Sequence, residues 1–249
     1  MGYKHFVLDY CPRWKMLSQR THRQGFSLVE LVVAMAIVAF VMALAIPTFG
    51  TWSQNVQIRT VAESIQNGLQ LARTEAMRRN TEVRFQLTST IDNTCALSTT
   101  QPNWVVNIGN ATATGTHDPT TLCGSTLLGP TVQWNSGTTP YLVQTYSANA
   151  VAPNVVASIS SAANSLIVFN SLGQVTWPTI AAASTCVSSA GTASSGNVAC
   201  IDLTNPTGGA CLAASGPMTC MRIEVTIPGG QIRMCNPNVT AGMPQGCLP

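Results

Sequence analysis

Two kinds of residue in this chain could do chemistry: a carboxylate inside a long apolar segment, and a set of cysteines. Glu30 is the only charged residue between Phe26 and Ile46, a run of 21 residues that is otherwise almost entirely apolar. A carboxylate is costly in a lipid environment, so its presence in such a segment indicates a partner or a function. Glu30 is therefore the first candidate functional residue.

The cysteines form the second candidate set. Nine are present, of which Cys11 lies near the N-terminus and eight follow the apolar segment. An even number of cysteines in an exported domain predicts disulfides, with free thiols or a metal site as the alternatives. The chain contains no C-x-x-C motif, the spacing that is typical of zinc sites, so the sequence does not favour zinc. Short loops favour pairing between neighbours, which would be Cys95–Cys123, Cys186–Cys200, Cys211–Cys220 and Cys235–Cys247.

No motif of a known catalytic site is present: the chain lacks G-x-S-x-G, a Walker loop and H-E-x-x-H. His117 is the only histidine after Gly50, and it stands beside Asp118 in a stretch rich in loop-forming residues. A single histidine in a loop is more often a surface residue than a general base. We expect no enzymatic activity, no cofactor and no metal.

The apolar segment has the length of a membrane span. As a helix, 21 residues measure about 30 Å, the thickness of the hydrocarbon core of a bilayer. Five basic residues precede Gly25 and only Asp9 opposes them, which under the positive-inside rule marks a cytoplasmic flank. Beyond Gly50, seven Arg and seven acidic residues balance, so the net charge gives no indication of nucleic-acid binding.

We expect the helix to continue past Pro47, whose ring removes one backbone hydrogen bond and predicts a kink. Apolar residues recur after it at three- and four-residue spacing, which predicts one buried face made of Ile58, Val61, Ile65, Leu69, Ala72 and Ala76. Two ion pairs are expected on the solvated face: Arg59 with Glu63, and Glu75 with Arg79. The helix is predicted over residues 26–80, with 26–46 in the membrane and Asn80 as its C-cap.

From Thr81 the pattern changes to the alternation of a β-strand. Val83, Phe85 and Leu87 alternate with polar residues, which predicts a half-buried strand. Further strands are expected at Trp104–Ile108, Tyr141–Ser147, Val155–Ser160, Ser165–Asn170, Gln174–Trp177, Val198–Leu203, Met221–Ile227 and Gln231–Cys235, with loops at 109–130 and 181–197. A long N-terminal helix packed on an antiparallel β-domain over 81–249 is an α+β fold.

The residues from Gly25 to Leu31 (GFSLVEL), together with Pro47, resemble the class III leader and N-terminus of type IV pilins and pseudopilins. In that family a prepilin peptidase cuts after the glycine and the new N-terminal phenylalanine is methylated. The resemblance implies that 1–25 is a cleaved cytoplasmic leader, that Phe26 is methylated, and that Glu30 and Pro47 serve assembly. Cleavage by ordinary signal peptidase at Ala43-Leu44-Ala45, which would release a soluble secreted protein, is the alternative.

Three later blocks are similar to the GspH/FimT-type minor pseudopilins. They are LARTEAMRRN at 71–80, FNSLG at 169–173, and Gly-x-x-Arg-x-Cys-x-Pro at 230–237. The resemblance implies a subunit that initiates or caps a type IV pilus or a type II secretion pseudopilus. Its partners would be other minor and major pilins or pseudopilins, the prepilin peptidase and the inner-membrane assembly platform. The chain would cross the bacterial inner membrane once, with its C-terminal domain in the periplasm.

Within this resemblance Glu30 acquires a partner. Cleavage creates an ammonium group on Phe26, and an opposite charge at contact distance lets a buried carboxylate keep its charge. In a bundle of helices that ammonium would belong to a neighbouring subunit and would fix the axial register. A carboxylate that reaches the lipid headgroups is the alternative.

DNA binding is a second possibility that the resemblance raises. Some FimT-like proteins bind DNA through basic residues of the C-terminal hairpin, in a Gly-Arg-x-Arg pattern. Here Arg222 and Arg233 are the candidates, but Gln231 stands in place of the first arginine. Phosphate binding requires several cations, and this part of the chain is neutral overall. A structural role for Arg233 at the sheet edge is the alternative.

Overall fold

The computed structural model describes residues 25–110, 118–125, 127, 141–160, 166–177, 186–188, 191–194 and 197–248. The predicted leader before Gly25 and the loop residue His117 lie outside these ranges. The chain divides into two compact units, Met1–Ala45 and Ile46–Pro249, and each is described by itself.

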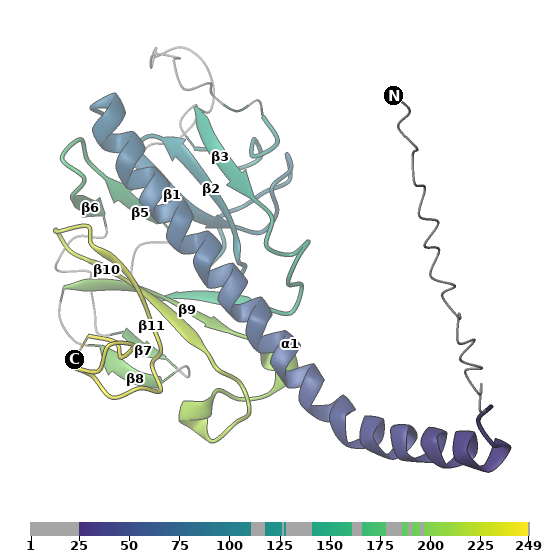
Figure 1. Cartoon of the computed structure of the whole chain (residues 1–249). Helices are drawn as coiled ribbons and strands as arrows, with labels where there is room; N and C mark the ends of the chain where they lie inside the picture. Colours follow the sequence, from purple (N-terminus) through teal and green to yellow (C-terminus); the bar gives the residue numbers. More distant parts are fainter. Residues whose placement is uncertain are drawn as a thin grey trace, which may run out of the picture. The chain divides into compact units, whose positions relative to one another are not determined.

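The helix α1 runs from Leu28 to Arg79 and continues through Pro47 (Figure 1). It ends where Asn80 adopts a left-handed conformation with φ of 51°. The amide of Thr81 donates to the Ala76 carbonyl, and the Asn80 amide donates to the Met77 carbonyl, which together form a Schellman motif. Asn80 therefore terminates the helix as predicted.

In the first unit, every residue from Gly25 to Ala43 is exposed. No helix among the described residues combines the length and the hydropathy that a membrane span requires.

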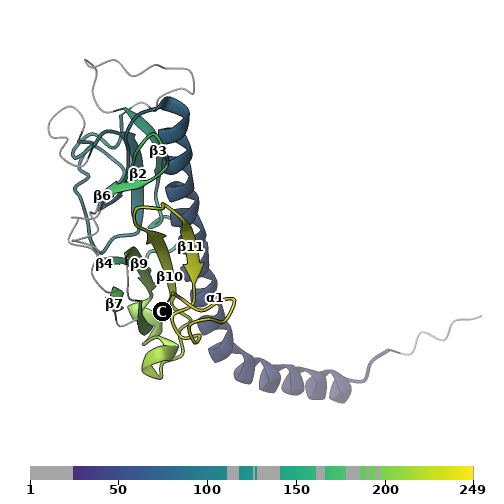
Figure 2. The same ribbon diagram turned by 90° about the vertical axis from the view of Figure 1, so that its left-hand side faces the viewer.

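In the second unit, the predicted apolar face of α1 is buried. Its six members have no exposed surface: Ile58, Val61, Ile65, Leu69, Ala72 and Ala76. Two sheets cover this face, and Figures 1 and 2 show both of them along one side of the helix. A close approach is needed at Gly68, where an added Cβ would lie 2.9 Å from the Phe85 ring and 3.0 Å from that of Trp104. Only glycine fits this contact without displacing the aromatic rings.

The first sheet has five antiparallel strands in the order β3-β2-β1-β5-β6. Their bounds are β1 Val83–Thr88, β2 Asn103–Ile108, β3 Leu142–Tyr146, β5 Leu166–Phe169 and β6 Val175–Trp177.

The second sheet has four antiparallel strands in the order β11-β10-β9-β4. Their bounds are β4 Val156–Ser160, β9 Val198–Thr204, β10 Met221–Thr226 and β11 Ile232–Cys235. A separate ribbon of β7 (Cys186–Ser188) and β8 (Gly191–Ser194) lies within 181–197, which was expected to be a loop. Two short 3-10 helices, Pro206–Gly208 and Leu212–Ala214, precede β10.

The prediction that β1 is half-buried was wrong. All six of its residues are buried, including Arg84 and Gln86 on the side away from α1. A small apolar cluster containing the Cys95–Cys123 disulfide, Val105 and Leu142 lies beside this part of the sheet. A sheet with both faces covered has no solvated side, so alternation of apolar and polar residues does not report exposure here.

Four disulfides brace the second unit, and they are the neighbour pairs that short loops favoured. They join Cys95 to Cys123, Cys186 to Cys200, Cys211 to Cys220 and Cys235 to Cys247. The Cys186–Cys200 disulfide joins β7 to β9, and the other three fasten segments with little regular structure to a sheet or to a neighbouring segment. The fold is α+β, a long helix with antiparallel sheets.

Candidate functional site

The predicted processing site lies just before the helix. Gly25, Phe26 and Ser27 are exposed and have no regular secondary structure, and Phe26 is 83% exposed. An added Cβ at Gly25 would meet nothing within 4 Å. Exposed backbone outside regular structure is the preferred substrate of proteases. The Gly25–Phe26 bond is therefore exposed, and its cleavage stays a prediction.

Glu30 lies in the first turn of α1, and its backbone amide donates to the Ser27 hydroxyl at 3.2 Å. Ser27-Leu28-Val29-Glu30 has the S-x-x-E spacing of a capping box, and the bond to the Ser27 hydroxyl is the half of it that the structure shows. This spacing was visible in the sequence but was not used to place the start of the helix. A carboxylate in the first turn also interacts favourably with the helix dipole. Ser27 thus caps the first turn, in which the Glu30 carboxylate lies, and the pairing of Glu30 with a neighbour's Phe26 ammonium stays a prediction.

The helix around Glu30 is apolar on all sides. Large apolar side chains from Phe26 to Met42 are between 51% and 83% exposed. A helix without a polar face is stable only inside a membrane or when surrounded by other apolar surfaces. This segment therefore requires an apolar environment, such as lipid or other helices.

The three sequence blocks that resemble minor pseudopilins meet in space. The Arg73 Nε donates to the carbonyl of Gly173 at 3.1 Å, which joins α1 to the β5–β6 turn. An added Cβ at Gly230, in the β10–β11 turn, would lie 2.3 Å from that same carbonyl oxygen. The amide of Val175 donates to the Pro228 carbonyl at 2.8 Å. We call Arg73, Gly173 and Gly230 the helix–hairpin junction, and it connects α1 with both sheets.

An ionic cluster lies near the end of α1. Glu75 receives hydrogen bonds from Arg78 and Arg79, each with a shortest N–O distance of 2.6 Å. The Glu75–Arg79 pair was predicted, but not its burial: the two side chains are only 14% and 8% exposed. Burial raises the pKa of Glu75, yet the hydrogen bonds and charges of the two arginines outweigh it and hold the pKa below its ordinary value.

The two arginines proposed for DNA contact are held inside the fold. Arg222 has no exposed surface, and its Nε lies 2.7 Å from an oxygen of buried Asp202. It cannot reach a phosphate group without disrupting the sheet. Arg233 is half-buried and donates from Nη2 to the carbonyl of Gly246, so it fastens the C-terminal tail. The structural role expected for Arg233 is the one that its geometry supports.

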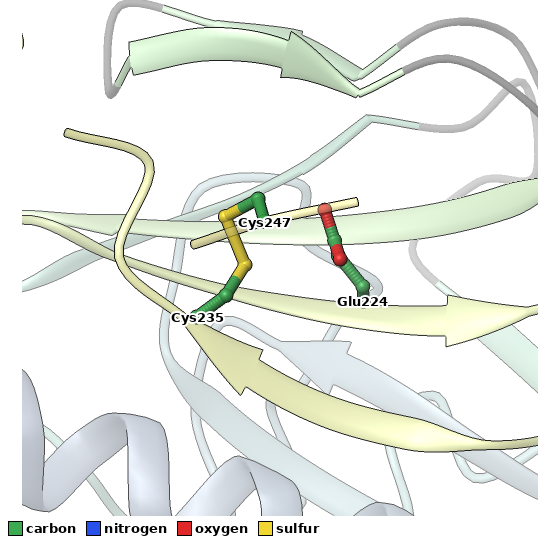
Figure 3. Close-up of side chains that lie close together, drawn as sticks. All are labelled: Glu224, Cys235 and Cys247. Carbon is green, nitrogen blue, oxygen red and sulfur yellow. A yellow bond between two sulfur atoms is a disulfide. The ribbon is translucent and has the colours of Figure 1, made fainter. Parts of the chain in front are cut away.

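Figure 3 shows Glu224 beside Cys235 and Cys247, three residues whose potential ligand atoms lie within 4.8 Å of one another. The two sulfurs are bonded to each other, so neither is a thiolate that could bind a metal. An oxygen of buried Glu224 accepts a hydrogen bond from the Leu248 amide at 3.0 Å. This cluster therefore holds the tail against the second sheet.

Two protein-family models match this chain. The prokaryotic N-terminal methylation motif matches residues 20–46, and the family described as type II transport protein GspH matches residues 61–238. No curated protein matches the sequence. Two crystal structures of the type IV minor pilin FimU from Pseudomonas aeruginosa strain PAO1 are 13% identical to this chain, with TM-scores of 0.37 and 0.39. They cover 71% and 74% of this chain, and the matches span 90% and 91% of theirs. Because the GspH match extends over well more than half of the sequence, the chain belongs to the type II transport protein GspH family and is a minor pilin or pseudopilin.

Proposed function

We propose that the mature protein begins at Phe26 and initiates or caps a type IV pilus or a type II secretion pseudopilus. The observation that carries this proposal is the helix at 28–43, which is exposed and apolar on every side and has one charge, in its first turn. Residues 26–46 would anchor the subunit in the inner membrane, with 81–249 in the periplasm. The prepilin peptidase and the assembly platform would act on its membrane segment in the inner membrane.

Assembly into a bundle of helices would account for Glu30, the single charge of this segment. An isolated carboxylate in an apolar bundle is destabilising, whereas one paired with an ammonium group retains its charge. Cleavage at Gly25 supplies this ammonium on Phe26 of each pilin-like subunit. Pairing between Glu30 and the Phe26 ammonium of a neighbour would select one axial register among the many that apolar helices allow.

The second unit suits the end of a filament. Three of its four disulfides brace segments that have little regular structure, the fourth joins β7 to β9, and the sequence carries few charges. Disulfides persist in an oxidising environment, and they stabilise such segments without a large hydrophobic core. Other minor pilins and the major subunit would pack below it through their own N-terminal helices.

Mass spectrometry of the protein extracted from membranes tests the proposal. The expected N-terminus is a methylated Phe26, in a protein that co-purifies with filament subunits. A chain that begins near Ile46 would instead indicate ordinary signal-peptide cleavage and a secreted protein. An intact chain that still carries residues 1–25 in cells with active prepilin peptidase would also contradict the proposal.

A further inference from the structure

The second unit carries a groove beside strand β11. It has a volume of about 400 Å3 and lies between α1, the start of β10, β11 and the C-terminal tail. Trp52 and Val56 line it from the helix and are 61% and 44% exposed, unlike the fully buried face that begins at Ile58. Met221 and Met234 line it from the sheet, and methionines adapt to the shape of a partner. The groove is large enough for a few side chains.

Strand β11 is the edge of the second sheet, and its hydrogen-bonding pattern can be assigned. The Thr226 amide donates to the Gln231 carbonyl, which makes these two residues a hydrogen-bonded pair. Such pairs alternate along an antiparallel ladder, so Arg233 and Cys235 also bond toward β10. The amides and carbonyls of Ile232 and Met234 therefore point away from β10, toward the open edge.

The C-terminal tail shows how this edge is used. The next residue in the same phase, Asn236, donates its amide outward to the carbonyl of Gln245 at 2.8 Å, and Asn236 forms a parallel bridge with Gly246. The tail thus extends the sheet beyond β11 by one short pairing. Within the ranges that the structure describes, no backbone partner is seen for the outward groups of Ile232 and Met234.

Lysine and proline are two of the devices with which proteins protect such an edge. β11 has neither, and its one charged residue, Arg233, is engaged with Gly246. The half-buried side chains of Ile232 and Met234 point to the α1 side of the sheet and pack against the core. An open edge beside an apolar groove is suited to an added strand, because main-chain bonds give affinity and the groove accepts alternate side chains.

We propose that an extended segment of a neighbouring pilin-like subunit pairs with β11 at Ile232 and Met234 and fills this groove. The proposal rests on the filament role given above and names a contact within it. Residues opposite Ile232 and Met234 share their face of the sheet, which is apolar, and the one opposite Met234 enters the groove. The residue between them faces the side of Arg233, where an acidic or carbonyl-bearing side chain complements the guanidinium.

Photo-crosslinking in the living bacterium tests this contact. The full-length chain carries p-benzoylphenylalanine at position 52 and is produced together with the cell's own filament subunits. We expect an adduct to a subunit that has its own N-terminal methylation motif, at a strand of that subunit's globular domain. Adducts that map to the partner's N-terminal helix, to a second copy of this chain or to lipid overturn the proposal.

Two substitutions at one position separate the backbone from the side chain. Met234→Pro removes the outward amide while the bonds of β11 to β10 remain, since proline is tolerated at edges where its nitrogen faces outward. Loss of one such hydrogen bond lowers adduct yield by up to about tenfold. Met234→Ala keeps the amide and lowers the yield by less. Leu172→Ala, at an exposed apolar residue of the β5–β6 turn, leaves it unchanged.

Folding and processing are measured in the same samples. Retained disulfides and protease resistance identify Met234→Pro chains that have folded, and equal yields from folded Met234→Pro and Met234→Ala overturn the strand pairing. A chain that carries p-benzoylphenylalanine at position 52 and no other change, begins at Phe26 and enters filaments without any adduct overturns the docking proposal alone. A start elsewhere overturns the proposed function, and the docking proposal with it.

Discussion

Arg222 and Asp202 form an ion pair with 2.7 Å between Nε and Oδ1, and the two side chains are 0% and 1% exposed. They lie on neighbouring strands, β10 and β9, at positions that face each other in the ladder. An arginine that the sequence suggested for DNA contact is thus part of the interior. The pair links the two central strands of the second sheet.

Removing one partner of this pair should be far more harmful than removing an exposed one. Asp202→Ala leaves the Arg222 charge buried without its carboxylate, which we expect to lower the free energy of unfolding by about 3–5 kcal/mol. Glu63→Ala breaks the exposed pair with Arg59, whose side chain is 70% exposed, and should cost at most about 1 kcal/mol. Urea unfolding of the full-length chain in detergent measures both. Similar losses for the two variants would contradict the assignment.

The helix–hairpin junction predicts a contrast between two glycines. Gly230 has φ of 66° and faces the Gly173 carbonyl, so Gly230→Ala combines backbone strain with a clash. Gly242 has φ of 92°, but an added Cβ there meets nothing within 4 Å. We expect Gly242→Ala to cost about 1–2 kcal/mol from strain alone and Gly230→Ala to cost clearly more. Thermal unfolding compares them, and equal costs would show that the contact with Gly173 does not constrain the fold.

The tail provides a test of disulfide bracing. Replacing Cys235 and Cys247 together by serine opens a loop with a sequence separation of 12. We expect a loss of about 2–4 kcal/mol and faster proteolysis after Asn236, because the remaining contacts of the tail are hydrogen bonds and the packing of Leu248 beside Val198. The matched double variant at Cys211 and Cys220, with a separation of 9, should lose stability without exposing the tail. Protease-resistant tails in both variants would refute this role.

Glu75 predicts a dependence of stability on pH. Burial raises its pKa, but the hydrogen bonds from Arg78 and Arg79 prevail and the pKa lies below its ordinary value. A group whose pKa falls on folding stabilises the native state above its unfolded pKa, and this contribution is lost as the pH falls through the folded value. Wild-type stability should therefore decline below about pH 4 more steeply than that of Glu75→Gln. Parallel pH profiles would exclude a contribution from this cluster.

Much of the fold followed from periodicity and turn chemistry. The buried face of α1 was visible in three- and four-residue spacing, and Asn80 was recognisable as a helix-ending residue. The short ribbon β7–β8 was not predicted, because its Ser- and Gly-rich sequence has the composition of a loop. The burial of Arg84 and Arg222 was also missed, since charged residues alternating with apolar ones normally indicate a solvated face. Their burial depends on segments distant in sequence that cover the outer sides of the sheets.

Around the candidate site, the motif at Gly25 was readable because several residue types keep fixed spacing. The open edge of β11 could not be predicted from the sequence, because it depends on the strand order and on which residues form hydrogen bonds to β10. Trp52 by itself did not indicate a binding surface either, since an aromatic residue on a helix is more often part of the core. Its exposure becomes significant only beside Met234 in the folded chain.

Glu30 allows its two roles to be separated. Suppose that its charge pairs with a neighbour's Phe26 ammonium. Glu30→Gln and Glu30→Ala should then both be inserted in the membrane and cleaved after Gly25. Both should enter filaments at least about tenfold less than wild type, a factor that corresponds to about 1.4 kcal/mol. If Glu30 acts only through the capping box, glutamine should substitute for it, because either residue suits that position.

Ser27→Ala provides the matching control for this experiment. It removes the hydroxyl that accepts from the Glu30 amide, at a cost of about 1 kcal/mol of helix stability, while the carboxylate stays in place. We expect it to assemble nearly normally. Quantitative immunoblotting of sheared filaments, against the membrane-bound pool as reference, measures all three variants. Normal incorporation of Glu30→Gln would show that the carboxyl charge is dispensable, and the single acid of the apolar segment would then be a helix cap.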